Sequence, residues 1–188
     1  MARRRFVEIP ACFSAKWRCA ATGRMDMMRA MHISPEHPML AAVVDDLATH
    51  GWSRQALFLP AERVRALAAE CRRRDAEGEL NPAGVGRGAT QEVREAIRGD
   101  QIQWIDPGQA EACDQYLAAM DQLRLAINQG LFLGLEDFEC HFALYPPGAF
   151  YRRHLDRFRD DDRRMVSAVL YLNEGWQPQD GGQLRMFL

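Results

Sequence analysis

The chain has 188 residues, of which 47% are hydrophobic and 27% charged, with a formal net charge of -2 and a pI of about 6.2. This length is enough for one domain with a sizeable core, and the near-neutral charge leaves no electrostatic footprint for nucleic acid or an anionic membrane. No apolar run approaches the roughly 20 residues that a membrane-spanning helix needs.

Residues 1–37 are predicted to form an N-terminal arm without stable structure. The segment has no sustained helical or strand period, and Pro10 and Pro35 interrupt it. Glu8 and Pro10 follow the basic start where a secretory signal would be apolar, so such a signal is excluded. The five cysteines of the chain show no metal-binding spacing, which favours reduced thiols in a cytoplasmic protein.

Three helices are predicted after the arm. The stretch "MLAAVVDDLATHGW" from Met39 repeats apolar residues at helical spacing, and "LFLPAERVRALAAECRRRD" follows, with Pro60 suited to a first turn. The third stretch, "GQAEACDQYLAAMDQLRLAINQGL", has the clearest period. Its apolar face consists of Cys113, Leu117, Met120, Leu123 and Ile127.

The segment "EGELNPAGVGRGATQ" between the second and third helices is predicted to be a mobile loop. Its glycines do not make a phosphate-binding loop, because neither a preceding strand nor a Lys-Ser/Thr pair accompanies them. The stretch "IRGDQIQWID" after it is a short strand candidate.

The hydrophobic period changes to two after the third helix. In "DFECHFALY" the apolar residues Phe138, Cys140, Phe142 and Leu144 alternate with a second set that includes His141 and Tyr145. Further strands are predicted at "FYRRHLD", "MVSAVLYLN" and "QLRMFL", separated by the charged loop "RFRDDDRR" and the turn "EGWQPQDGG". Helices followed by a run of strands indicate an α+β fold whose β part is a barrel or sandwich.

His154 and Asp156 are candidate metal ligands. Residues two apart on a strand point to the same face, so the imidazole nitrogen and the carboxylate oxygen would converge. That donor pair suits a borderline metal such as Fe(II). The two residues alone also fit a solvent-exposed strand that ends in a turn-starting acid, so both interpretations stay open on the residues.

Four blocks of the sequence resemble the Fe(II)- and 2-oxoglutarate-dependent dioxygenases, and within them the prolyl 4-hydroxylase and oxygen-sensing prolyl hydroxylase branch. In chain order the blocks are "IRGDQIQWID", "LYPPGAFYRRHLD", "VLYLNEGW" and "DGGQLRMF". The resemblance implies a double-stranded β-helix, or jelly-roll, supported by N-terminal helices, with residues 38–188 as the dioxygenase domain. It also implies Fe(II), 2-oxoglutarate as cosubstrate, ascorbate as reductant, and hydroxylation of a prolyl residue in a protein or peptide.

The resemblance also assigns site residues. His154 and Asp156 match two members of an iron-binding triad of two histidines and one carboxylate. Tyr171 and Tyr145 match tyrosines that contact 2-oxoglutarate, with barrel packing as the alternative role. The substrate side is implied to be formed by Arg98, Asp100 and Tyr151, with a structural salt bridge between the first two as the alternative.

The third metal ligand of the family pattern is missing from this sequence. The pattern needs a further histidine after Asp156 and a basic residue beyond it to pair with the cosubstrate, but no histidine follows His154 and Arg185 lies in another block. His141 is weighed as a substitute, with a packed polar residue as the alternative. The chain is therefore predicted to be C-terminally truncated, with an incomplete barrel and marginal stability, because strand edges would be unpaired.

Two other functions stay open at this point. A catalytically inactive remnant or binding module of the family would fold without taking up iron. A cupin-like barrel would use His154 with different ligands, although the context of Tyr171 argues against it. The sequence predicts neither a nucleic-acid nor a membrane partner, and it leaves the substrate and the oligomeric state open.

Overall fold

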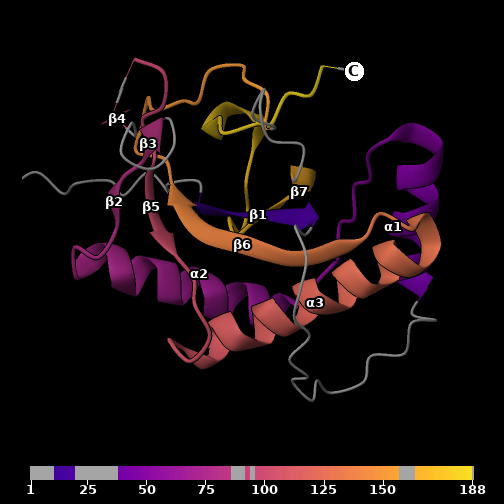
Figure 1. Cartoon of the computed structure of the whole chain (residues 1–188). Coiled ribbons are helices and arrows are strands. Elements are labelled where there is room, and N and C mark those ends of the chain that lie inside the picture. Colours follow the sequence, from indigo (N-terminus) through magenta and orange to yellow (C-terminus); the bar gives the residue numbers. More distant parts are fainter. Residues whose placement is uncertain (1–10, 20–37, 86–91, 94–95, 157–163, 188) are drawn as a thin grey trace, which may run out of the picture.

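The computed structural model describes residues 11–19, 38–85, 92–93, 96–156 and 164–187. These residues combine a layer of helices with an antiparallel sheet, as expected for an α+β protein (Figure 1). None of the helices in this part of the chain has the length and apolarity that a membrane span needs.

The three helices confirm the sequence prediction. Helix α1 spans Pro38–His50, α2 spans Ala61–Ala76 and α3 spans Glu111–Leu131. Pro60 lies at the N-cap of α2, one residue before the helix begins. Phe132 ends α3 in the left-handed conformation, with a φ of 55°.

The main sheet has five strands in the order β2-β5-β6-β1-β7, and all neighbouring strands are antiparallel. Their bounds are Asn81–Pro82 for β2, Gln101–Trp104 for β5, Leu135–Leu144 for β6, Ala11–Cys19 for β1 and Arg164–Tyr171 for β7. A separate two-stranded sheet pairs β3, Gly84–Val85, with β4, Glu92–Val93.

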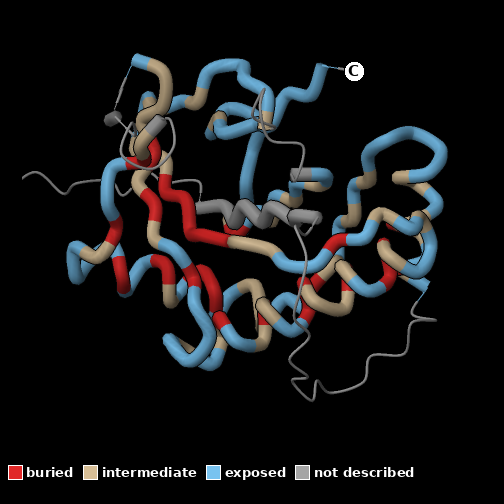
Figure 2. Tube along the Cα trace, viewed as in Figure 1, coloured by how far each residue is buried: buried red, intermediate tan, exposed pale blue. Residues whose placement is uncertain are grey.

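The two faces of β6 have different environments, as the period of two predicted. Cys140, Phe142 and Leu144 are buried in the main core between the sheet and the helices. Ala143 lies on the other face, where it packs with Ile102 in a small second cluster. Figure 1 shows α2 and α3 along one side of the sheet, and Figure 2 shows buried residues concentrated between them and β6.

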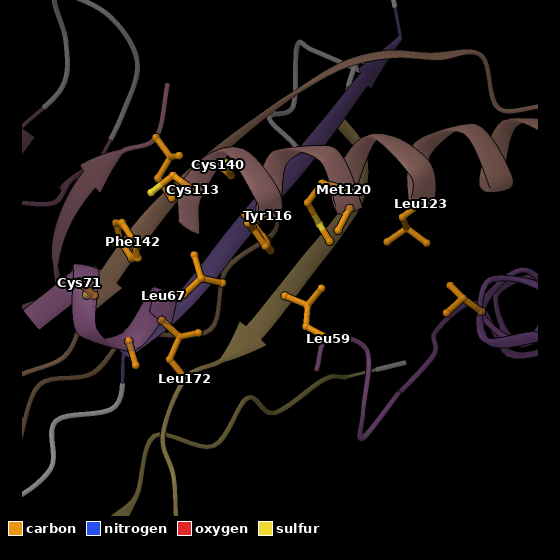
Figure 3. Packing of buried hydrophobic residues seen from close by; sticks show 14 of the residues in the cluster. Leu59, Leu67, Cys71, Cys113, Tyr116, Met120, Leu123, Cys140, Phe142 and Leu172 are labelled. Carbon is orange, nitrogen blue, oxygen red and sulfur yellow. The ribbon is translucent and has the colours of Figure 1, made fainter. Parts of the chain in front are cut away.

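The main core joins all three helices to the sheet (Figure 3). Its most deeply buried members include Leu67, Cys71, Tyr116, Ile127, Phe142 and Leu172. Burial raises the pKa of the Cys71 and Cys140 thiols to about 12, so both stay neutral at physiological pH. Among the described side chains, those of Cys71, Cys113 and Cys140 are free thiols.

A buried arginine links α2 to the segment just before α3 and to β6. The Arg74 side chain is only 2% exposed, and its Nε donates to Oε1 of Glu70 over 2.7 Å. Its Nη1 donates to Oε1 of Gln109 over 3.0 Å, and its guanidinium lies 5.2 Å from the ring centre of Phe142. The buried charge is therefore compensated by a carboxylate, an amide and an aromatic face.

Strand β1 lies inside the segment that was predicted to be an unstructured arm. It pairs with β6 from Ala11 opposite Leu144 and with β7 from Cys12 opposite Tyr171. The sequence signal for it is the short alternation in "ACFSAKWRC", which a search for long periods misses. The strand forms because its backbone groups pair with both neighbours, whereas the rest of residues 1–37 lies outside the described ranges.

Two predicted strands are wrong, because neither segment has a neighbouring strand to pair with among the described residues. The "FYRRHLD" segment makes only an isolated bridge between Tyr151 and Arg98, and "QLRMF" has no strand structure. The predicted loop 77–91 instead contains β2 and β3, while its residues 86–91 are outside the described ranges. The charged loop at residues 157–163 is also outside them.

The close contact between α1 and α3 gives a first prediction. A β-carbon added to Gly130 would lie well inside van der Waals distance of Cγ1 of Val44. Valine has a stiff, β-branched side chain, so overpacking should cost about 1–3 kcal/mol, more than the roughly 1 kcal/mol that alanine gains in helix propensity. We expect Gly130→Ala to lower the free energy of unfolding in urea.

The matched test of that contact is the double variant Val44→Ala/Gly130→Ala. Removing the two methyl groups of Val44 makes room for the new β-carbon, so the double variant should be more stable than the sum of the single effects by about 1 kcal/mol. Additive changes in the free energy of unfolding, or a stabilising Gly130→Ala, would contradict the tight contact between Gly130 and Val44.

The ion pairs of Glu70 give a second prediction. Hydrogen bonds from Arg73, followed by those from Arg74, outweigh burial and lower the pKa of Glu70 to about 2. A carboxylate whose folded pKa is depressed stabilises the fold above its unfolded pKa of about 4.3 and loses that contribution as pH falls through the folded value. The free energy of unfolding should therefore fall as the pH is lowered from about 4.5 to about 2. This fall should be less steep in the Glu70→Gln variant than in the wild type. Glu62→Gln, an exposed carboxylate of the same helix, should keep the wild-type slope.

Candidate metal centre and cosubstrate site

Two segments far apart in the sequence form the base of the candidate site. The backbone N–H of Gly99 donates to the carbonyl of Phe150 over 3.0 Å, and that of Arg152 donates to the carbonyl of Ile97 over 2.9 Å. These bonds pin the turn that precedes β5 against the segment that follows β6. A β-carbon at Gly99 would lie 3.3 Å from Cβ of Ala149, which is tight, so glycine allows this close approach.

His154 and Asp156 do converge, but a bend brings them together and not a strand. The His154 Nε2 lies 3.1 Å from Oδ1 of Asp156, and both side chains are partly exposed. The Nδ1 of the same ring lies 2.7 Å from the carbonyl oxygen of Arg152. Both ring nitrogens of His154 are therefore held by oxygen atoms.

The surroundings of the imidazole fit a bound cation. A carbonyl oxygen only accepts, so Nδ1 carries the hydrogen of that bond and a neutral ring turns its Nε2 lone pair toward a carboxylate. Two lone pairs face each other unless a proton or a metal ion lies between them. Metal bonds of about 2.1 Å place neighbouring ligands of an octahedral ion about 3.0 Å apart, which matches the Nε2–Oδ1 separation of 3.1 Å.

The described ranges contain no group of three or more histidine, cysteine, aspartate or glutamate side chains that could hold a metal ion. His141, the substitute weighed from the sequence, is buried in β6 and meets Trp104 edge-on at 5.0 Å between ring centres. This contact fits the alternative role of a packed polar residue. Of the candidate ligands, the structure brings His154 and Asp156 together.

Arg98, Asp100 and Tyr151 form one connected cluster behind this pair. Arg98 donates from Nε and Nη2 to the two carboxylate oxygens of Asp100 over 2.6 and 2.7 Å. The side chain of Asp100 is fully buried and that of Arg98 is 13% exposed. The guanidinium lies 4.7 Å from the ring centre of Tyr151, whose ring stacks on His154 at 3.6 Å between centres.

The electrostatics of the cluster favour a charged Arg98 and a neutral Tyr151. Burial opposes the charge of Arg98, but the hydrogen bonds and the charge of Asp100 outweigh it, so the pKa of Arg98 is raised. Burial is also the main reason that the pKa of Tyr151 is raised, against the lowering effect of Arg98. The Tyr151 hydroxyl therefore keeps its proton at neutral pH.

The two tyrosines assigned to the cosubstrate lie near the ends of β6 and β7. The Tyr171 hydroxyl donates to the carbonyl of Gly182 over 3.0 Å and accepts from the N–H of Leu184 over 2.8 Å. Tyr145 is partly buried and packs against the small cluster of Ala83, Ile102 and Ala143. Tyr171 thus holds the segment after the turn at Pro178–Asp180, a role that its position in the sequence did not reveal.

The Arg152 carbonyl and the stacking of Tyr151 on His154 are features that sequence reasoning missed. A carbonyl belongs to every residue, so its orientation leaves no signal in the sequence. Tyr151 was placed on the substrate side because it precedes the predicted ligand, whereas its ring faces that ligand. The contact lies within the bent segment between Tyr151 and Asp156.

Comparison with known proteins gives two matches. A family model described as the 2OG-Fe(II) oxygenase superfamily matches residues 140–188. The chain is also similar to a prolyl-4-hydroxylase from Pseudomonas putida of known crystal structure, at 91% sequence identity. That match covers 80% of this chain and 77% of the solved chain, with a TM-score of 0.74.

The hydrogen bonds of Tyr171 give a third prediction. Tyr171→Phe removes the hydroxyl that bridges Gly182 and Leu184, at a cost of about 1 kcal/mol. The Leu184 amide should then exchange its hydrogen several-fold faster, because its acceptor is lost. Tyr145→Phe removes the same atom from the other tyrosine and should leave this amide unchanged. Equal exchange of the Leu184 amide in wild type and Tyr171→Phe would refute the bridge.

Proposed function

Because the chain belongs to the 2OG-Fe(II) oxygenase superfamily, in its prolyl-4-hydroxylase-like branch, we propose that it hydroxylates a prolyl residue of a protein or peptide. The chain is an oxygenase of a family that uses Fe(II) and 2-oxoglutarate, and ascorbate is commonly involved in the prolyl hydroxylases. The observation that carries the proposal is the 91% identity to a prolyl-4-hydroxylase over 80% of this chain.

His154 and Asp156 are the proposed protein ligands of Fe(II). Their 3.1 Å separation and the orientation of the imidazole support this role. With 2-oxoglutarate and oxygen, the bound iron supplies the oxidation, in which the cosubstrate becomes succinate and carbon dioxide and the substrate gains a hydroxyl. The protein's part is to place the imidazole, the carboxylate and the substrate relative to one another.

Tyr145 and Tyr171 are proposed to contact 2-oxoglutarate. A phenol hydroxyl donates well to a carboxylate, and Tyr171 is 40% exposed, so its hydroxyl can be reached by a small anion. The hydrogen bond that Tyr171 now donates to Gly182 would pass to the cosubstrate carboxylate. Binding of 2-oxoglutarate would in this way change the contacts of the 175–187 segment.

The substrate side is proposed to be built on Arg98, Asp100 and Tyr151. Arg98 and Asp100 bind each other through both carboxylate oxygens and are largely withdrawn from solvent. That geometry favours the structural salt bridge among the two roles weighed from the sequence. The ion pair of Arg98 and Asp100 would support the substrate entrance from the protein interior. A peptide substrate would contact the exposed residues around that ion pair.

The finer fold assignment, a double-stranded β-helix, is also a proposal. Helices cover one face of the sheet, yet the opposite face of β7 is apolar as well, with Met165, Val169 and Tyr171 all exposed. Strands that are apolar on both faces are typical of sheets packed on both sides. A second sheet facing β7 would give the jelly-roll that the family resemblance implies.

A cytoplasmic location is proposed on the free thiols alone.

The proposal is tested by coupled turnover. The chain is incubated with Fe(II), 2-oxoglutarate, ascorbate and a proline-containing peptide, and succinate is measured beside the oxygen added to the peptide by mass spectrometry. One hydroxyproline per succinate is expected. Metal-dependent succinate release without peptide oxidation would contradict the prolyl substrate, and stable folding without metal uptake would instead favour an inactive binding module.

A fourth prediction concerns the ligand pair. His154→Ala and Asp156→Ala should each weaken Mn(II) binding, measured by calorimetry, by at least about 100-fold, more than loss of a residue outside the coordination sphere costs. The matched control is His50→Ala, which removes an exposed histidine that also lies beside an aspartate, Asp46, at 3.9 Å. Wild-type affinity in Asp156→Ala would remove the carboxylate from the proposed site.

A further inference from the structure

The ring plane of His154 is fixed by two contacts. The Arg152 carbonyl holds Nδ1 at 2.7 Å, which anchors one point of the ring but leaves it free to pivot. The Tyr151 ring stacks on the imidazole with centres 3.6 Å apart and planes inclined by 16°. Since the lone pair of Nε2 lies in the imidazole plane, the stacking sets the direction in which Nε2 meets a metal ion.

The Tyr151 ring is in turn held by groups that barely contact solvent. The Arg98 guanidinium lies over it at 4.7 Å, and Asp100, with a fully buried side chain, fixes that guanidinium through two hydrogen bonds. Backbone pairing of Arg98 with Tyr151 keeps their segments together. A buried, bidentate ion pair leaves Arg98 little rotational freedom, and a cation over an aromatic face is attractive by about 0.5–2 kcal/mol.

We propose that Tyr151 and Arg98 are positioning residues, which fix the imidazole plane of His154 for metal binding through the series Asp100, Arg98, Tyr151 and His154. The inference rests on the proposed role of His154 as an iron ligand. It assigns to the Tyr151 ring, and not to its hydroxyl, a function toward the metal, in addition to its proposed place on the substrate side. Partners of this kind restrict a metal-binding histidine before the metal arrives, which lowers the entropic cost of binding.

The test compares metal binding by the full chain in the wild type and in variants of this series. Co(II) is the probe, because its visible absorption spectrum reports the ligand geometry, and its affinity is measured by titration. Tyr151→Leu removes the flat ring and should raise the dissociation constant about 10–100-fold, the range found when partners of metal-binding histidines are lost. The absorption bands should also shift. Tyr151→Phe keeps the ring and should stay within about threefold of wild type with an unchanged spectrum.

Phe150→Leu is the matched control. Phe150 is the neighbouring aromatic residue, it also has a guanidinium over its ring, that of Arg152 at 5.9 Å, and it is half-exposed. Its loss should change neither the dissociation constant nor the spectrum. Thermal unfolding of each variant in the absence of metal separates a loss of fold from a loss of positioning.

Arg98→Lys is a milder second variant, because lysine keeps the charge but cannot form the two parallel hydrogen bonds of the guanidinium. It should weaken Co(II) binding about 3–10-fold.

The outcomes separate this inference from the proposed function. If His154→Ala abolishes Co(II) binding while Tyr151→Leu binds as the wild type does, the positioning role is overturned and the proposed iron ligand stands. If Tyr151→Phe weakens binding as strongly as Tyr151→Leu, the hydroxyl and not the stacked ring is responsible, and the inference is wrong. If His154→Ala binds Co(II) like the wild type, both the proposed ligand and the positioning role fail.

Discussion

The two-sided environment of β6 is the constraint on which most of the structure depends. Alternate side chains of one strand point to opposite faces. Cys140 and Phe142, the sequence neighbours of His141, therefore lie on the same face of β6 and pack against the helices. The other face carries Ala143 and, just beyond the strand, Tyr145. After β6 the chain continues on the side of the sheet away from α2 and α3 (Figure 1). It passes a turn at residues 147–148 and the bridge of Tyr151 to Arg98 before it enters the bend that holds His154. The candidate site therefore lies where the sheet is not covered by α2 and α3.

Arg74, which is buried, and Arg98, which is partly buried, show how the chain places charge away from solvent. Arg74 in the core and Arg98 in the site each bind a carboxylate and each lie against an aromatic ring. A buried ion pair adds little net stability, because desolvation offsets most of the attraction, but it restricts geometry strongly. In the core this links helices to the sheet. In the site it orders the cluster on which the imidazole rests.

The site combines a rigid base with exposed functional groups. Hydrogen bonds between the backbones of residues 97–99 and 150–152 hold the base, while the carboxylate of Asp156 and the ring of His154 remain accessible. This combination suits the proposed iron ligands, because the base orders them while they stay open to a cosubstrate and a substrate. The hydroxyl of Tyr171 links the end of β7 to the chain segment around Gly182 and Leu184.

The sequence by itself determined the three helices, strands β5, β6 and β7, and the identity of the two candidate ligands. Local periodicity carries this information, because a helix such as α3 buries one stripe of its own residues whatever its partners are. The family resemblance added the chemistry. It rests on short blocks around Arg98, His154 and Tyr171 that are contiguous in the chain.

The tertiary structure alone decided where β1 pairs, that "FYRRHLD" bends, and that Tyr151 stacks on His154. The segment was predicted to be a strand, but a strand needs a neighbour with free backbone groups, and among the described residues Tyr151 makes only the single bridge to Arg98. The convergence of His154 and Asp156 was expected from strand geometry and arises instead from the Arg152 carbonyl and a bend. Contacts between residues distant in the chain depend on which backbone N–H and C=O groups still need a hydrogen-bond partner. Local sequence does not encode which groups these are.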